Sequence, residues 1–84
     1  MKLSVIVPCY NEENTIEKII DKIIENTEPS TEIIVIDDKS IDNTNHILKN
    51  SIKNKITKLI INEKNFGKGY SIRQGIKEAS GDII

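Results

Sequence analysis

Two short apolar runs constrain the fold of this 84-residue chain more than any other feature. They are "KLSVIVP", residues 2–8, and "EIIVI", residues 32–36, and both are rich in β-branched side chains. Such runs are typical of strands that are buried on both faces in a parallel sheet. Pro8 predicts that the first strand ends near Val7, and the second strand is predicted to end at Ile36.

Between these runs the apolar residues change to helical spacing. The apolar residues form a single stripe, and charged residues lie on the opposite face of the expected helix. The stripe consists of Ile16, Ile19, Ile20, Ile23 and Ile24. This period of about 3.6 residues predicts a helix from Glu12 to Asn26. Asn11 precedes it and is predicted to be its N-cap, because an Asn side chain accepts hydrogen bonds from free N–H groups of the first turn.

The rest of the chain repeats the alternation more weakly. We predict a helix over 42–51, a strand over 57–64, a helix over 70–79 and the start of a fourth strand over 80–84. The third helix is expected to turn one small and apolar face inward, formed by Gly69, Ile72, Ile76 and Ala79.

The order of these elements, β-α-β-α-β-α-β, predicts an α/β fold with a Rossmann-like parallel sheet and right-handed crossovers. Ligands of such sheets bind outside the carboxyl ends of the strands. Three polar loops are therefore expected to converge at that edge: "PCYNEEN", "DDKSIDNT" and "NEKNFGKGYSIRQG".

Length, charge and cysteine content limit the classes of function. A chain of 84 residues forms one domain at most and buries roughly 60 to 65% of its unfolded surface. Its 12 basic and 13 acidic residues give no basic patch that would indicate a nucleic-acid partner. The single Cys9 excludes an internal disulfide, and the run after Met1 is too short for a signal peptide or a spanning helix, so a cytoplasmic location is expected.

Asp37 and Asp38 follow the second strand directly. Two carboxylates there can accept hydrogen bonds from ribose hydroxyls or a base N–H, and can help to hold a divalent cation where phosphates are present. The same pair has a simpler interpretation, in which Asp37 caps the loop and Asp38 caps the next helix.

The glycine loop "NFGKG" matches neither common phosphate loop. A Walker loop would need Ser or Thr after Lys68, and a Rossmann fingerprint would need glycines after the first strand. A receiver domain also fits poorly, since its paired acids follow the first strand. Lys68 and the backbone N–H groups of a helix start can still approach a diphosphate. Alternatively, the loop only begins the helix and Lys68 is solvated.

Three motifs taken together resemble one family. "SVIVPCYNEENTIEKII", "EIIVIDDKSIDNT" and "NFGKGYSIRQGIKEASGDII" resemble, in this order and spacing, the amino-terminal half of family 2 glycosyltransferases with the GT-A fold. The likeness is greatest to the polyprenyl-phosphate glycosyltransferases of the dolichyl-phosphate mannosyltransferase type. It covers essentially all of residues 1–84, and departs at Lys39 and Ile41, where "DDGSTDGT" is commoner, and at Tyr70 and Ile72.

The resemblance assigns a role to several residues. It implies that Pro8, Tyr10 and Glu12 line the base and ribose of a nucleotide sugar, and that Asp38 accepts a hydrogen bond from the nucleoside with support from Asp37. A second group faces the diphosphate and consists of Lys68 and Arg73. Arg73 has an alternative role, in which it pairs with Asp38 and orients it.

Catalytic groups are not expected in this chain. In the family, an Asp-x-Asp segment that holds a divalent metal, magnesium or manganese, follows a few residues after the position of Ile84, and the catalytic base comes later still. The resemblance therefore implies that residues 1–84 are the nucleotide-sugar-binding part of a longer inverting glycosyltransferase, truncated in the fourth strand. They alone are expected to hold no metal tightly and to be inactive.

The implied acceptor includes a polyprenyl phosphate, which would place the longer protein at the cytoplasmic face of a membrane. Two alternatives remain: a non-catalytic nucleotide-binding module, and a folding fragment that self-associates through an open sheet edge.

Four nearby residues also have structural interpretations. Tyr10 can be a partly buried aromatic at a strand end, and Glu12 can be an acid favoured by the helix dipole. His46 has no second histidine or cysteine near it and is expected to be solvated. Cys9 has no basic neighbour and is expected to be a packing residue.

Overall fold

The computed structural model describes residues 2–83 and contains one parallel sheet. Its strands are β1 (Leu3–Cys9), β2 (Glu32–Asp37), β3 (Lys58–Ile61) and β4 (Asp82–Ile83), in the spatial order β3-β2-β1-β4. Every neighbouring pair is parallel. This confirms the predicted α/β fold with a Rossmann-like sheet. Because Cys9 pairs with Asp37 and Asp37 pairs with Ile61, the three long strands end side by side.

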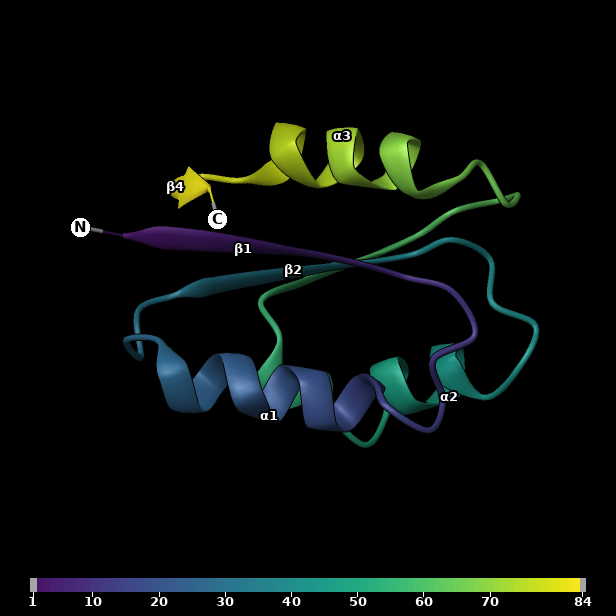
Figure 1. Cartoon of the computed structure of the whole chain (residues 1–84), viewed down its shortest axis with the longest axis horizontal. Coiled ribbons are helices and arrows are strands. Elements are labelled where there is room, and N and C mark those ends of the chain that lie inside the picture. Colours follow the sequence, from purple (N-terminus) through teal and green to yellow (C-terminus); the bar gives the residue numbers. More distant parts are fainter. Residues whose placement is uncertain (1, 84) are drawn as a thin grey trace.

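Helices cover both faces of the sheet. The helices α1 (Ile16–Asn26) and α2 (Thr44–Lys49) lie on one face, and α3 (Lys68–Glu78) lies on the other (Figure 1). A short 3-10 turn, η1 (Lys53–Lys55), precedes β3. None of the helices within residues 2–83 is both long and apolar enough to cross a membrane.

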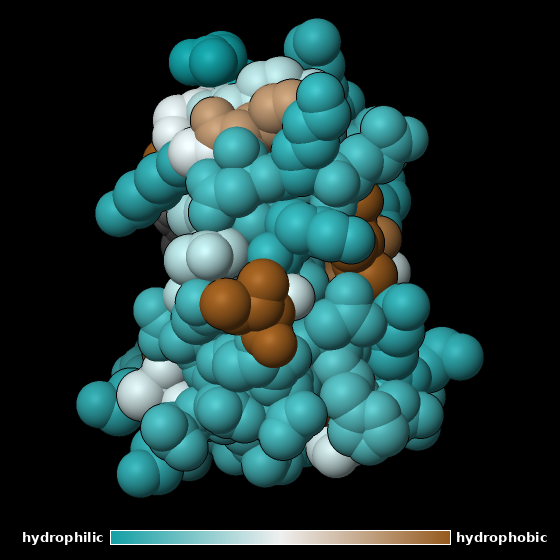
Figure 2. Space-filling view, turned by 90° about the vertical axis from the view of Figure 1, so that its right-hand side faces the viewer, coloured by the Kyte–Doolittle hydropathy of each residue, from teal (hydrophilic) through white to brown (hydrophobic). Residues whose placement is uncertain are grey.

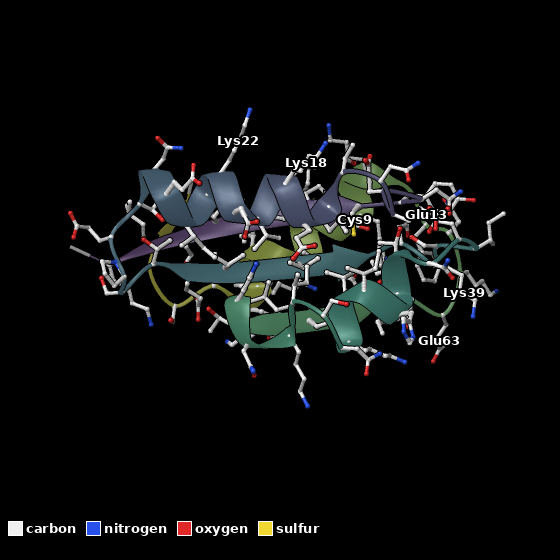
Figure 3. All side chains as sticks on the ribbon, turned by 90° about the horizontal axis from the view of Figure 1, so that it is seen from below. Cys9, Glu13, Lys18, Lys22, Lys39 and Glu63 are labelled. Atoms are coloured by element: carbon white, nitrogen blue, oxygen red, sulfur yellow. The ribbon has the colours of Figure 1, made fainter. Side chains whose placement is uncertain are left out.

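The core between the sheet and α1 is built from side chains of the predicted strands and helical stripe. Its buried members are Val7, Cys9, Ile16, Ile20, Ile33, Val35, Leu48 and Ile52. The charged face of α1 points outward, as the stems of Lys18 and Lys22 show in Figure 3. Burial of such β-branched and aliphatic side chains stabilises the fold by roughly 1.5 to 3 kcal/mol each.

The inner face of α3 differs from the prediction. Ser71 and Gly75 are the buried residues of this helix, whereas Gly69 and Ile76 are exposed. The helix begins two residues earlier than predicted, at Lys68, and it needs small residues on the inner side because it lies close to β1 and β2. The predicted inner face is therefore wrong for Gly69 and Ile76, whereas Ile72 and Ala79 are half-buried.

Two predicted boundaries at the first loop are also wrong. Pro8 lies inside β1, which continues to Cys9. It is tolerated there because β4 pairs only with Leu3 and Ser4 and does not reach Pro8. The helix α1 begins at Ile16 with Thr15 at its N-cap position, and Asn11 instead adopts a left-handed backbone with a φ of 53°.

The opposite, amino-terminal edge of the sheet contains a buried carboxylate. Glu32, only 4% exposed, accepts hydrogen bonds from Ser4 Oγ at 2.8 Å and from the Ser80 N–H at 2.9 Å. These bonds lower the pKa of Glu32 to about 2, with the Ser80 N–H as the largest cause, followed by the Ser4 hydroxyl. The contact connects the segment after α3 to the first two strands.

Candidate functional site

The loops after β1, β2 and β3 meet at the carboxyl edge of the sheet, at the right of Figure 1. Figure 2 views the molecule from this side and shows a largely hydrophilic surface with a small apolar patch near its middle. A pocket of about 220 Å³ lies among these elements, lined by Pro8, Cys9, Tyr10, Glu12, Asp38, Lys68 and Ser71. Five of the seven sequence-predicted site residues line it, and the other two, Asp37 and Arg73, do not.

Asp38 is the most completely hydrogen-bonded side chain of the pocket. Its Oδ1 accepts the Phe66 N–H at 2.8 Å, and its Oδ2 accepts the Gly67 N–H at 2.8 Å. Burial raises the pKa of the Asp38 carboxyl, but hydrogen bonds from Asn62, Phe66 and Gly67 outweigh it and hold the pKa below its ordinary value. Asp38 is therefore a carboxylate at neutral pH, and it connects the loop after β2 to the start of α3.

This arrangement excludes two of the predicted alternatives for Asp38. Its oxygens do not cap α2, because their partners lie in the third loop. Arg73 does not orient it either, since Arg73 forms no ion pair with any residue in the range 2–83.

Asn62, which follows β3, is a site residue that the sequence analysis did not identify. It is 4% exposed, and its Nδ2 donates to Asp38 Oδ1 at 2.8 Å and to Ser71 Oγ at 3.1 Å. Its backbone N–H donates to the Asp37 carbonyl at 2.9 Å. An Asn between a strand and a polar loop is also a common turn residue, so the sequence carried no distinct signal for this role.

Asp37 has the structural role that the simpler interpretation assigned to it. Its side chain is fully buried, and Oδ1 accepts hydrogen bonds from the backbone and hydroxyl of Ser40. Its Oδ2 accepts from Asn45 Nδ2 at 3.3 Å. Asp37 thus closes the loop after β2 and supports Asp38 through the backbone.

The first two loops are joined by reciprocal hydrogen bonds. Asn11 donates its N–H to Ser40 Oγ at 2.9 Å and accepts the Ile41 N–H through Oδ1 at 2.9 Å. The Glu12 N–H donates to Thr44 Oγ1 at 2.8 Å. The role of Asn11 is therefore to join the first two loops, and not to cap α1 as predicted. The same contacts hold the neighbouring Tyr10 and Glu12 at the pocket.

Asp42 is the acid that caps α2. Its Oδ1 accepts from the Thr44 N–H at 2.9 Å and from the Thr44 hydroxyl at 2.6 Å, while Oδ2 accepts the Glu13 N–H at 3.2 Å. Asp42 therefore does for α2 what one interpretation had assigned to Asp38.

The start of α3 faces the pocket with positive character. Gly67 precedes the helix with a φ of 96°, a backbone conformation that favours glycine. The next three N–H groups, residues 68–70, form no hydrogen bond within the described part of the chain. Together with the exposed Lys68 side chain they can approach an anion.

Cys9 lines the pocket, but its sulfur lies in the core between α1 and the sheet (Figure 3). Burial, with the nearby Asp37 carboxylate, raises the pKa of the thiol to about 12. A thiol that stays protonated is a poor nucleophile, so Cys9 is a packing residue.

Three further predicted residues occupy the surface. Tyr10 is exposed at the pocket mouth. Arg73 is exposed on α3 and His46 is exposed on α2. His46 belongs to no group of three potential metal ligands among residues 2–83.

Within the described residues no group of three His, Cys, Asp or Glu side chains is placed to hold a metal ion. The Asp38 carboxylate, which lines the pocket, accepts the N–H groups of Phe66 and Gly67. The arrangement instead suits a ligand with hydrogen-bond donors for Asp38 and an anionic group for Lys68.

Comparisons with known proteins identify the family. The family model for "Glycosyl transferase family 2" matches residues 4–84. The poly-beta-1,6-N-acetyl-D-glucosamine synthase of Staphylococcus epidermidis is 35% identical over 82 residues, which are 98% of this chain and 20% of that protein. The undecaprenyl-phosphate 4-deoxy-4-formamido-L-arabinose transferase of Proteus mirabilis is 32% identical over 89 residues, covering 99% of this chain and 27% of that protein.

A solved structure gives the same result. The crystal structure of S. aureus TarS 1-349 in complex with UDP-GlcNAc superimposes with a TM-score of 0.87 and 32% identity. The match covers all of this chain and 25% of that one. The chain thus spans about a fifth to a quarter of the proteins that it matches.

Proposed function

This chain belongs to glycosyltransferase family 2, and from that premise we propose that residues 1–84 are the nucleotide-sugar-binding part of an inverting glycosyltransferase. The observation that carries the proposal is the pocket at the carboxyl edge. It combines a buried carboxylate, Asp38, with the cation of Lys68 at the start of α3. A nucleoside diphosphate has hydrogen-bond donors at one end and anionic oxygens at the other, so it is complementary to both.

In this proposal the nucleoside lies against the first two loops. Pro8 and Tyr10 provide the apolar surface for the base and ribose, and Glu12 lies beside them in the same pocket. Asp38 accepts a hydrogen bond from the nucleoside, and Asp37 supports it by holding the loop. Such a pocket binds through a few polar contacts on a partly apolar wall.

The diphosphate then lies over the start of α3. Lys68 and the N–H groups of residues 68–70 supply positive charge and donors toward it. Arg73 is exposed on the same helix and provides longer-range attraction. These groups bind and orient the donor.

The proposed reaction of the longer protein is a single displacement, in which an acceptor oxygen attacks the anomeric carbon and the nucleoside diphosphate leaves. Family resemblance assigns the divalent metal, magnesium or manganese, and the catalytic base to segments after Ile84. In this proposal the contribution of residues 1–84 to the reaction is donor binding.

A polyprenyl phosphate is the acceptor that we propose for the longer protein, at the cytoplasmic face of a membrane. The resemblance to polyprenyl-phosphate glycosyltransferases supports it, as does the Proteus mirabilis relative, whose name contains undecaprenyl phosphate. The rings of Phe66 and Tyr70 lie 4.4 Å apart between centroids, tilted by 35° to each other, and both residues are exposed. In this proposal the pair offers apolar contact to such an acceptor.

Chemical-shift mapping with UDP and GDP tests the binding proposal. We expect the amide signals of Tyr10, Glu12, Asp38 and Lys68 to shift, because the ligand contacts their loops. Shifts confined to the outer face of α1 or to His46 would contradict the proposal.

A charge variant separates the two ends of the ligand. Lys68→Gln should weaken the binding of UDP about fivefold, because one exposed ionic contact is worth about 1 kcal/mol. The affinity for uridine, which has no phosphate, should be unchanged. The matched control is Lys77→Gln in the last turn of the same helix, which should leave both affinities unchanged. Equal losses for UDP and uridine in Lys68→Gln would place Lys68 away from the diphosphate.

A further inference from the structure

The buried side chain of Asn62 contacts both an acid and a hydroxyl of the pocket. Its Nδ2 lies 2.8 Å from Asp38 Oδ1 and 3.1 Å from Ser71 Oγ. Asp38 directly follows β2 and Ser71 lies in the first turn of α3, so the amide bridges two segments that line the pocket.

We propose that Asn62 is a positioning residue of the nucleotide pocket: it fixes the Asp38 carboxylate and the Ser71 hydroxyl toward the ligand and, through Asp38, holds the backbone of residues 66–67. The inference rests on the proposed function, because it takes the pocket ligand to be a nucleotide.

The first step of the argument concerns the two oxygens of Asp38. Oδ1 accepts from both Asn62 Nδ2 and the Phe66 N–H, which uses its two lone pairs. Among the described residues, Oδ2 accepts the Gly67 N–H. Asn62 thereby occupies Oδ1 and leaves Oδ2 as the oxygen that faces a ligand donor.

The second step concerns Ser71. Because Ser71 Oγ accepts the Asn62 N–H, its own O–H is free to point to the Asp38 carboxylate, whose pKa it helps to lower. Ser71 lines the pocket beside Asp38. The amide of Asn62 therefore holds the Asp38 carboxylate and the Ser71 hydroxyl together at one side of the pocket.

The third step concerns the other end of the amide. Asn62 Oδ1 is buried and has no hydrogen-bond partner among residues 2–83. A buried oxygen without a partner costs stability. In this orientation of the amide, Nδ2 donates to both Asp38 and Ser71. The contacts with these two pocket residues therefore account for the orientation, although Oδ1 is left without a partner.

A double-mutant cycle with UDP and GDP as probes tests the proposal in the full 84-residue chain. Asn62→Ala should weaken nucleotide binding about tenfold, the loss expected for one hydrogen bond to a charged group. If Asn62 acts through Asp38, the double variant Asn62→Ala/Asp38→Ala should bind no more weakly than Asp38→Ala alone. Additive losses, or unchanged affinity in Asn62→Ala, would overturn the proposal.

Asn65→Ala is the matched control, since Asn65 lies in the same loop and is exposed, and its side chain makes no hydrogen bond among the described residues. It should leave affinity unchanged. If Asn62→Ala does not fold, Asn62→Ser removes the same amide with a smaller polar side chain and carries the same expectations.

A ligand-free measurement separates failure of this inference from failure of the proposed function. Amide hydrogen exchange of Phe66 and Gly67 should be about tenfold faster in Asn62→Ala, while exchange in the middle of β2 is unchanged. Unchanged exchange at both amides would overturn the positioning role. A wild-type chain that binds neither nucleotide would overturn the proposed function, and faster exchange would then still support the hold of Asn62 on the loop.

Discussion

Gly75 of α3 lies directly against Ile6 of β1, so closely that a Cβ atom built on Gly75 would be 2.5 Å from Ile6 Cγ2. The same atom would be 2.8 Å from Ile36 Cδ1 on β2. A larger residue fits only if the side chains of Ile6 and Ile36, or the helix itself, move. This close approach places the start of α3, with Lys68 and Ser71, beside the ends of β1 and β2.

Gly75→Ala should therefore lower the free energy of unfolding by about 1 to 3 kcal/mol, the usual cost of an extra methyl group in a packed core. Helix propensity alone predicts the opposite, a gain of up to about 1 kcal/mol. Urea unfolding followed by circular dichroism measures the difference.

Gly69→Ala is the matched control in the same helix. The nearest atom to a Cβ there is Arg73 Nη1 at 3.6 Å, an ordinary contact with a flexible side chain. This variant should gain up to about 1 kcal/mol from helix propensity. A Gly75→Ala variant as stable as Gly69→Ala would show that α3 does not lie so close to the sheet.

Lys39 provides a second test, because it adopts a left-handed backbone with a φ of 63° in the loop after β2. A residue with a Cβ is strained there, by roughly 1 to 2 kcal/mol, and glycine is not. Lys39→Gly should remove this strain, but glycine also loses more conformational entropy on folding than lysine. The net effect should be a rise of up to about 1 kcal/mol in the free energy of unfolding. Thermal or urea unfolding measures it.

Lys64→Gly is the control for this substitution, since Lys64 is also an exposed loop lysine but has no positive φ. It should be slightly destabilising, by about 0.5 to 1 kcal/mol. If both variants changed stability in the same direction, the strain at Lys39 would be disproved.

Glu32 gives the chain a pH-dependent stability at the edge opposite the pocket. Its folded pKa is about 2, below the ordinary value of 4.5, so its contribution is fully present above pH 4.5 and is lost as the pH falls toward 2. Between these values the wild type should lose about 1 to 3 kcal/mol more than Glu32→Gln. Urea unfolding at pH 5, 3.5 and 2 measures this, and parallel curves for the two proteins would refute it.

The sequence predicted the fold well, because each strand and helix carries a local signal. The apolar runs identified β1 and β2, and the Ile stripe identified α1, since burial on one or two faces leaves a period in the chain. The inner face of α3 was mispredicted for the opposite reason. The inner face of α3 is determined by the close contact of Gly75 with Ile6. A glycine that faces the sheet adds nothing to the hydrophobic pattern of the sequence, so this face could not be predicted from the pattern.

The pocket was predicted in part. Tyr10, Asp38 and Lys68 follow strands or begin a helix, so topology alone brings them to one edge. Asn62 and Ser71 were missed because their role depends on contacts between residues far apart or buried in the fold, and each has a common structural use in its local setting. The positioning role of Asn62 and the nucleotide contacts of the pocket residues stay predictions.

Self-association through an open sheet edge also stays a prediction. Within the described sheet, β3 and β4 are each paired on one side only. Open edges of this kind pair with other chains unless they are covered or charged. Sedimentation velocity over a range of concentrations should show an average mass that rises with concentration, whereas a constant monomer mass would contradict this.

The last prediction is that the 84-residue chain transfers no sugar by itself. A leaving diphosphate must be neutralised, and such electrostatic stabilisation is commonly the largest catalytic effect. Lys68 supplies a single exposed charge, and the carboxylates of Asp37 and Asp38 are occupied by N–H and hydroxyl donors. Asp82 pairs with Leu3 at the start of β1, at the edge of the sheet away from the pocket.

The assay combines the purified chain with a panel of nucleotide sugars, magnesium or manganese, and a polyprenyl phosphate. No product above a blank is expected, while UDP or GDP should still shift the pocket amides of the same preparation, which shows that the site is folded. Metal-dependent turnover would mean that catalytic groups lie within residues 1–84, and the first ones to replace would then be Glu12 and Asp38, the two acids that line the pocket.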